Sequence, residues 1–248
     1  MFRALLNRRK DRLALAGDRD DWPREFARLE QDAVDFRLRN FYEAGVVDAD
    51  TPLKDVPFVA MDFETTGLNP ARDDIVSVGL VPFSLDRIRC RESRHWIVNP
   101  RQPLAEQSVV IHGITHSDVS NAPDLMRILE LLLESLAGKV VVVHYRRIER
   151  EFLNTAMQAR LAEGISFPVV DTMDLEARLH RTGRSGFVAR LKGDKPVSIR
   201  LADSRTRYGL PYYQPHHALT DALATAELLQ AQIANRFTPE TPISEIWR

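Results

Sequence analysis

The sequence predicts a mixed α/β fold in which one partly antiparallel sheet packs against helices. Three observations predict it. Three strand-like segments follow one another with short links between residues 58 and 100, which favours an antiparallel meander. A continuous β-branched run, VVVV at 140–143, is typical of a buried central strand. Helix-like and strand-like segments then alternate up to a long helical segment at 218–237.

The first 53 residues are highly charged and carry apolar residues at helical spacing. These positions, three or four residues apart, are Phe26, Leu29, Ala33 and Phe36. The spacing predicts an amphipathic helix, and Pro23 suits its first turn. Residues 1–17 hold an apolar stretch too short and too broken by Arg and Lys for a secretory signal, which favours another short helix. We expect residues 1–53 to form a helical extension that packs on a domain at 54–248, docks a partner protein or mediates self-association.

The next segments alternate between strand and helix. The loop DADTPLKDVP leads into the three strands, at 58–64, 74–83 and 92–100. A helix is predicted at 121–139, because leucine and isoleucine recur at helical spacing and Gly138 can terminate it. The apolar stripe is Leu125, Ile128, Leu129, Leu132, Leu133 and Leu136. After the VVVV strand, a helix at 146–161 and a strand at 167–172 follow.

A basic insert at about 178–214 interrupts this pattern. Its only acidic residues from 178 to 207 are Asp194 and Asp203. Two interpretations stay open: the insert extends a groove that contacts phosphates, or it is a solvated loop. The basic residues are Arg178, Arg181, Arg184, Arg190, Lys192, Lys195, Arg200, Arg205 and Arg207.

Composition excludes several classes of protein. Hydrophobic residues make up 44% of the chain and charged residues 28%, which is ordinary for a soluble globular protein. A formal net charge of −1 argues against a protein that coats duplexes nonspecifically. No apolar run approaches the roughly 20 residues that span a bilayer. Cys90 is the only cysteine, so an intrachain disulfide and a zinc finger are excluded and a reducing cytoplasm is favoured.

Asp62 and Glu64 are the first candidates for chemistry. They lie two residues apart on a predicted strand, so both side chains leave the same face. Two neighbouring carboxylates repel one another unless a cation lies between them. The turn Thr65–Leu68 ends the strand and places the pair near an edge of the sheet. By itself the pair is more often a solvated face than a metal site.

Two further pieces follow in the chain. His216 precedes Asp221 by five residues at the start of the last helix, where an acid interacts favourably with the helix dipole. Glu149 lies in the helix after the VVVV strand, between arginines, where a surface ion pair is the ordinary interpretation. Each piece is weak evidence alone, but all three come at the end of a predicted core element.

In this order, the three pieces resemble the DEDD exonuclease superfamily in its histidine-containing (DEDDh) branch. That branch includes the proofreading epsilon subunit of bacterial DNA polymerase III, ribonuclease T and oligoribonuclease. The family motif DxETTGL is present from Asp62 to Leu68, and HxAxxD from His216 to Asp221. IHGIT at 111–115 and VVDT at 169–172 resemble further family elements. The resemblance covers residues 57–235.

One family motif is altered. The family usually has HNAxFDxxFL, and this chain has HYRRIEREFL at 144–153. Glu149 therefore stands where the family has aspartate, and Tyr145 where it has asparagine. Glutamate keeps the charge but is one methylene longer, which Mg²⁺ would tolerate less well than a more flexible ion. Tyr145 cannot replace the amide and either stacks on a base or packs locally.

The resemblance implies a ribonuclease-H-like fold with a five-stranded mixed sheet, and a 3′→5′ exonuclease that uses two Mg²⁺ or Mn²⁺ ions. It implies that Asp62, Glu64, Glu149 and Asp221 bind the ions, and that His216 acts as general base. It also implies that the 3′-terminal nucleotide of single-stranded DNA or RNA lies against Thr65, Thr66, Gly67, Leu68 and His112. DNA is the favoured substrate; an exoribonuclease and a weakly active or noncatalytic binding relative are the alternatives.

Overall fold

A five-stranded mixed sheet forms the centre of the protein. The computed structural model describes residues 21–104, 109–110, 112–181 and 197–248. The strand order is β3-β2-β1-β4-β5; the first three strands pair antiparallel, and β4 and β5 run parallel to β1. The predicted meander and the interior place of the VVVV strand are confirmed. The strands are β1 (Phe58–Thr65), β2 (Ile75–Phe83), β3 (Arg94–Ile97), β4 (Val140–Val143) and β5 (Val169–Asp171).

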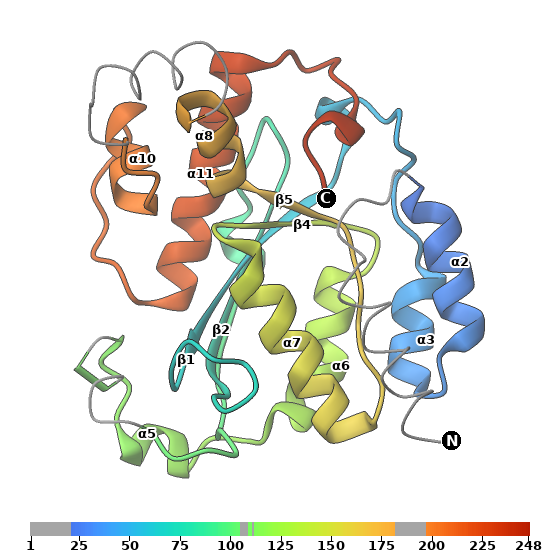
Figure 1. The fold of residues 1–248 in the computed structure, drawn as a ribbon, viewed down its shortest axis with the longest axis vertical. Helices are drawn as coiled ribbons and strands as arrows, with labels where there is room; N and C mark the ends of the chain where they lie inside the picture. Colours follow the sequence, from blue (N-terminus) through green and yellow to red (C-terminus); the bar gives the residue numbers. More distant parts are fainter. Residues whose placement is uncertain (1–20, 105–108, 111, 182–196) are drawn as a thin grey trace.

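Helices cover the sheet from both sides. Figure 1 shows α6 and α7 on one side, with α8, α10 and α11 on the other. This arrangement is the ribonuclease-H-like fold that the sequence resemblance implies. No helix in the described ranges is long and apolar enough to cross a membrane. The helices are α2 (Trp22–Asp32), α3 (Phe36–Glu43), α5 (His116–Ser120), α6 (Leu125–Leu136), α7 (Arg146–Leu161), α8 (Thr172–Arg181), α10 (Leu201–Arg207) and α11 (Ala218–Arg236), with 3-10 turns at Leu53–Asp55, Cys90–Glu92 and Ile243–Glu245.

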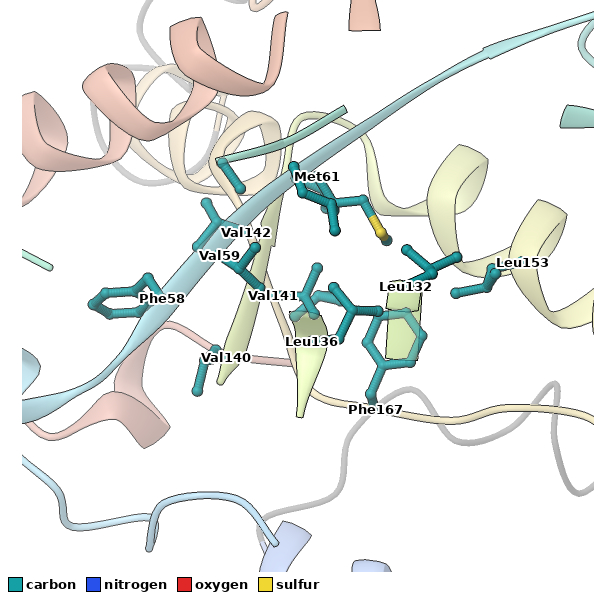
Figure 2. Close-up of a cluster of buried hydrophobic side chains, with 14 of the residues drawn as sticks. Phe58, Val59, Met61, Leu132, Leu136, Val140, Val141, Val142, Leu153 and Phe167 are labelled. Atoms are coloured by element: carbon teal, nitrogen blue, oxygen red, sulfur yellow. The ribbon is translucent and has the colours of Figure 1, made fainter. Parts of the chain in front are cut away.

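The main core lies between the sheet and α6 and α7. Figure 2 shows Val59 and Met61 of β1 directed toward Leu132 and Leu153, whereas Phe58 points away from them. Because side chains alternate along a strand, the even-numbered residues of β1 face the opposite side, toward α11. The six apolar positions predicted for α6 are all buried. The odd-numbered residues of β1 therefore pack in this core, and the opposite face of the strand carries the carboxylates Asp62 and Glu64.

The N-terminal segment forms two helices where the spacing predicts one. Ala33 has an extended backbone and ends α2, and the Asp35 side chain caps α3 by accepting from the Arg37 N–H at 2.9 Å. Pro23 occupies the first turn of α2, as predicted. Phe36 starts the second helix and is 55% exposed, so it does not share the buried face. The break arises because Asp35 competes as a helix cap, which a count of apolar spacing does not register.

These two helices pack into the same hydrophobic core as the sheet. Trp22, Phe26, Phe41 and Tyr42 are buried, and the Phe41 ring meets Phe167 edge-on at 6.5 Å. The Tyr42 hydroxyl accepts a hydrogen bond from the Ser166 N–H at 3.0 Å. The segment thus buries its aromatic face on residues that precede β5. The helix predicted within residues 1–17 lies outside the described residues.

The basic insert is partly helical and anchored. Its residues 182–196, with Arg184, Arg190, Lys192 and Lys195, lie outside the described ranges. Arg205 of α10 is 3% exposed and donates to Ala224 O at 2.7 Å and to Glu227 Oε2 at 2.7 Å. Arg207 pairs with the buried Glu176 carboxylate. These arginines therefore hold α10 against α11 and α8, so the α10 part of the insert is not a solvated loop.

Candidate active site

Three carboxylates from two elements meet near the C-terminal end of β1. Asp62 and Glu64 lie on the same face of β1, and Asp221 lies in the first turn of α11. Ligand oxygens of the three residues all lie within 4.8 Å of one another. Glu64 is buried, whereas Asp62 and Asp221 are half-buried. The pairing predicted from sequence order is therefore a spatial cluster, which we call the carboxylate trio.

A glycine on β2 allows this meeting. Gly79 is the register partner of Asp62. A Cβ atom at Gly79 would lie 2.3 Å from both the carbonyl carbon and oxygen of Ala218, the first residue of α11. Only glycine permits so close an approach between backbones. The N-terminus of α11 thus packs directly on the sheet beside Asp62, which places the Asp221 carboxylate close to those of Asp62 and Glu64.

Glu149 supplies a fourth carboxylate next to the trio. It lies in the first turn of α7, is 2% exposed, and its Oε2 atom has no hydrogen-bond partner among the described residues. Burial and the nearby charge of Asp171 hold its pKa well above the usual range. A buried, unpartnered carboxylate oxygen is costly unless a proton or a cation satisfies it. Glu149 therefore fits as a ligand on the α7 side of the trio.

The carboxyl groups raise one another's pKa values. Burial, together with the charges of Glu149, Asp221 and Glu64, holds the pKa of Asp62 well above its usual range. Burial and the charge of Asp221 raise the pKa of Glu64 to about 8. Burial also raises the pKa of Asp221, partly offset by the hydrogen bond from the His216 N–H. Like charges this close ionise together only when a cation lies among them, so the residues present fit a divalent ion with oxygen ligands.

Asp171 is a contributor that sequence reasoning missed. It ends β5 and accepts hydrogen bonds from the Tyr145 N–H at 3.1 Å and the Arg146 N–H at 3.0 Å. These two bonds hold Tyr145 in a left-handed conformation, φ 91°, at the start of α7. Asparagine adopts this conformation more readily than tyrosine. Asp171 thereby orients the helix that carries Glu149. In the sequence, an acidic residue at the end of a predicted strand was the feature that could have identified it.

His216 and His217 have different surroundings. His216 has a left-handed backbone, φ 70°, and its N–H donates to Asp221 Oδ2 at 2.7 Å. The side chain of His217 instead caps α11 by accepting from the Thr220 N–H, and its ring centroid lies 4.7 Å from that of His95. The backbone bond ties His216 to the carboxylate trio, whereas His217 is engaged in capping. The role of His216 as general base, which the sequence resemblance implies, stays a prediction.

A pocket of about 250 Å³ opens beside the trio, between β1–β3 and the turn before α5. Glu64, His112 and His216 line it, along with His95 and Asp118. Burial lowers the pKa of His112, and its Nδ1 accepts a hydrogen bond from the Ile114 N–H at 3.1 Å. The ring is therefore neutral with its proton on Nε2, an atom that is buried without a partner among the described residues. His112 thus offers a donor at this pocket.

The turn after β1 is rigid and presents one apolar side chain. Thr65 Oγ1 donates to Gly67 O at 2.6 Å, and Thr66 is buried with its hydroxyl accepting from the Asp74 N–H at 3.0 Å. A Cβ atom at Gly67 would lie 2.5 Å from the Asp73 carboxylate. Leu68 follows and is 83% exposed. Tyr145, which precedes α7 in the altered motif, is 39% exposed.

The chain matches the sequence model of a known protein family. The family model described as Exonuclease (RNase_T) matches residues 59–229, which is most of the chain and includes every carboxylate of the site. The chain belongs to this exonuclease family. The sequence resemblance to the DEDD exonucleases is thereby confirmed.

Relatives and solved structures agree with the family. A DNA polymerase III subunit epsilon-like protein of Rhodobacter capsulatus is 31% identical over 180 residues, covering 72% of this chain and 24% of the relative. The DNA polymerase III subunit epsilon of Treponema pallidum is 29% identical over 181 residues, which cover 73% of this chain and 78% of the relative. The chain spans about a quarter or less of the length of several of the curated relatives that it matches. The nuclease domain of 3′hExo, a DEDDh family member bound to rAMP, superposes with a TM-score of 0.60 at 16% identity, covering 73% of this chain and 92% of that one.

Proposed function

We propose that this exonuclease is a metal-dependent 3′→5′ enzyme that releases nucleoside 5′-monophosphates from the 3′ end of single-stranded nucleic acid, with DNA as its main substrate. The observation that carries the proposal is the carboxylate trio, with the buried Glu149 close enough to act on the pKa of Asp62 and the His216 N–H hydrogen-bonded to Asp221. Such a group repels itself at neutral pH unless cations balance it, and phosphodiester hydrolysis requires that same concentration of positive charge.

Each residue has a part in the proposed reaction. Asp62, Glu64 and Asp221 would hold one Mg²⁺ or Mn²⁺ ion, and Glu149 together with Asp62 would help to hold a second. When bound, these ions would stabilise developing negative charge and lower the pKa of the attacking water. His216 takes the proton of the attacking water, whose oxygen forms a bond to phosphorus as the bond between phosphorus and the 3′ oxygen breaks. The leaving 3′ oxygen takes a proton from solvent to become a new 3′-hydroxyl, and the terminal nucleotide departs as a 5′-monophosphate.

The pocket beside Glu64 suits the terminal nucleotide. Thr65, Thr66 and Gly67 form the hydrogen-bonded turn that follows Glu64 in the chain, and the exposed Leu68 is available to contact a base. His112 Nε2 is a donor that an oxygen of the nucleotide satisfies. Tyr145 borders the site on the α7 side, where an exposed ring can stack on a base.

The test is digestion of a 3′-labelled single strand with Mg²⁺ or Mn²⁺, followed by chromatography of the products. Wild type should release 5′-mononucleotides from the 3′ end, and Asp62→Ala should lose activity by at least about a hundredfold. Asp50→Ala, which removes an exposed acid away from the site, is the matched control. A wild-type protein that leaves the strand intact, or a fully active Asp62→Ala variant, would contradict the proposal.

RNA is the second candidate substrate. One solved structure of similar fold, with a TM-score of 0.59, is of a 3′-exonuclease in 3′-end-specific recognition of a histone mRNA stem-loop. The curated relatives instead carry names of DNA polymerase III subunits, which favours DNA. Parallel digestion of DNA and RNA of equal sequence separates the two by their kcat/KM values. A protein that binds strands but hydrolyses neither is the noncatalytic alternative.

A further inference from the structure

A second, shallow pocket lies on the other side of Asp221. It is formed by α10, the loop at 208–217 and the start of α11, which Figure 1 shows side by side. Its lining includes Arg205, Leu210, Tyr212, Tyr213, Pro215 and Asp221. Asp221 also belongs to the carboxylate trio. The pocket therefore opens directly beside the point where a scissile phosphate would bind.

The back of this pocket is held firmly in place. The Arg205 guanidinium lies over the Tyr213 ring, 4.6 Å from its centroid, and donates to Pro211 O at 2.9 Å. Glu227 accepts hydrogen bonds from both Arg205 and the Tyr213 hydroxyl, at 2.7 and 3.0 Å. The Arg205 guanidinium thus fixes the position of the loop, and its contact with the ring together with the hydrogen bond to Glu227 holds Tyr213 in place as one side of the pocket.

Tyr212 projects from this ordered loop and is 78% exposed. An aromatic ring left in water beside a catalytic carboxylate suits a flat apolar ligand, and every nucleobase has such a face. The two pockets flank the segment 215–221: Glu64 and His216 line the first, whereas Pro215 and Asp221 line the second. A strand whose phosphate lies at the trio, with its last nucleotide in the first pocket, has the preceding nucleotide on the side of the second.

We propose that the second pocket binds the penultimate nucleotide of the substrate strand, with Tyr212 stacked on its base. The inference rests on the proposed function and adds a subsite to it. Because stacking uses the face of a base and not its edge, the subsite accepts all four bases but requires that a base be present.

The test compares kcat/KM of wild type, Tyr212→Ala and Tyr212→Trp on short single strands. One strand is unmodified, one lacks the base second from the 3′ end, and one lacks the base fourth from that end. Phe36→Ala is the matched control, because Phe36 is 55% exposed on α3, across the sheet from α10. Stacking of the usual strength predicts a loss of about tenfold for Tyr212→Ala on the unmodified strand, with recovery in Tyr212→Trp.

The abasic strands locate the effect. The loss caused by Tyr212→Ala should largely vanish when the second base is absent and persist when the fourth is absent. An equal loss on all three strands, or a loss no greater than that of Phe36→Ala, would overturn the subsite. So would a change of molar mass by light scattering in Tyr212→Ala, which would assign the ring to contact with a second copy of the chain.

Binding separates this inference from the proposed function. Fluorescence anisotropy of a labelled strand is measured in an Asp62→Asn background, which prevents cleavage, with and without Tyr212→Ala. A Kd about tenfold higher without the ring supports the subsite even if the wild type proves to hydrolyse nothing. An unchanged Kd overturns the subsite, whatever the enzyme's activity.

Discussion

Gly79 and Ala218 are in backbone contact so close that a Cβ atom at Gly79 would lie 2.3 Å from the Ala218 carbonyl. Asp62 pairs with Gly79 across β1 and β2, and Asp221 follows Ala218 by less than one turn of α11. The contact therefore sets the separation of two carboxylates that come from distant parts of the chain. A glycine with no chemistry of its own determines whether the site can form.

We expect Gly79→Ala to lower activity by at least about a hundredfold, because the added methyl pushes the N-terminus of α11 away from Asp62 and misplaced groups lose catalysis steeply. Digestion of a labelled strand measures the loss. Gly45→Ala is the control: Gly45 is left-handed at φ 70° with nothing within 4 Å of a new Cβ. That variant should lose about 1 kcal/mol of stability and keep its activity. Full activity in Gly79→Ala would show that α11 can shift without consequence.

The metal-free protein should become less stable as pH rises from about 5 to 8. Glu64 has a folded-state pKa of about 8 against an ordinary value of 4.5. The folded state therefore binds the proton more tightly than the unfolded state, so this contribution is complete below the ordinary value and is lost as pH rises through the folded value. Thermal unfolding in a chelator, scanned over pH, measures it.

Glu64→Gln should flatten this pH dependence, because the amide does not titrate. Adding Mn²⁺ to the wild type should raise the melting temperature more at pH 8 than at pH 5, since a cation replaces the protons that the carboxyl groups lose. A wild-type melting temperature that rises from pH 5 to pH 8 without metal would contradict the assigned pKa direction.

Glu149 should determine the preference between metals. Glu149→Gln removes a buried charge next to Asp62, and we expect kcat to fall about a hundredfold or more with either ion. Glu149→Asp restores the family's residue and shortens the side chain by one methylene. Because Mg²⁺ demands stricter geometry than more tolerant ions, this variant should change the ratio of Mg²⁺- to Mn²⁺-supported kcat. Equal ratios in Glu149→Asp and wild type would mean that the extra methylene is irrelevant to metal choice.

Substitutions of the two adjacent histidines should have different effects on activity and stability. His216→Ala removes the proposed general base, and we expect kcat to fall by about 10²–10⁴-fold with little change in stability. His217→Ala removes the cap of α11 and should cost about 1 kcal/mol in urea unfolding, with a much smaller effect on kcat. The reverse pattern would exchange the roles of the two residues.

The sequence by itself determined the order of the core elements and the identity of the candidate ligands. The stripe from Leu125 to Leu136 and the VVVV strand follow simple periodicities, and all of these residues are buried as predicted. Asp62, Glu64, His216 and Asp221 stand in motifs whose spacing is local, so the residues could be named without coordinates. The break at Ala33–Asp35 and helix α10 could not be predicted in this way, because capping by Asp35 and the burial of Arg205 among distant acceptors override local pattern.

Tertiary structure alone decided how the named residues meet. Asp62 and Asp221 are 159 positions apart in the sequence, and their approach depends on Gly79, whose lack of a side chain matters only once α11 lies on the sheet. Asp171 and Tyr212 gained their significance in the same way, from the neighbours that folding gave them. A linear sequence records which groups are present, whereas pKa values, vacant donors and pockets are properties of distance and burial, which exist only after the chain has packed.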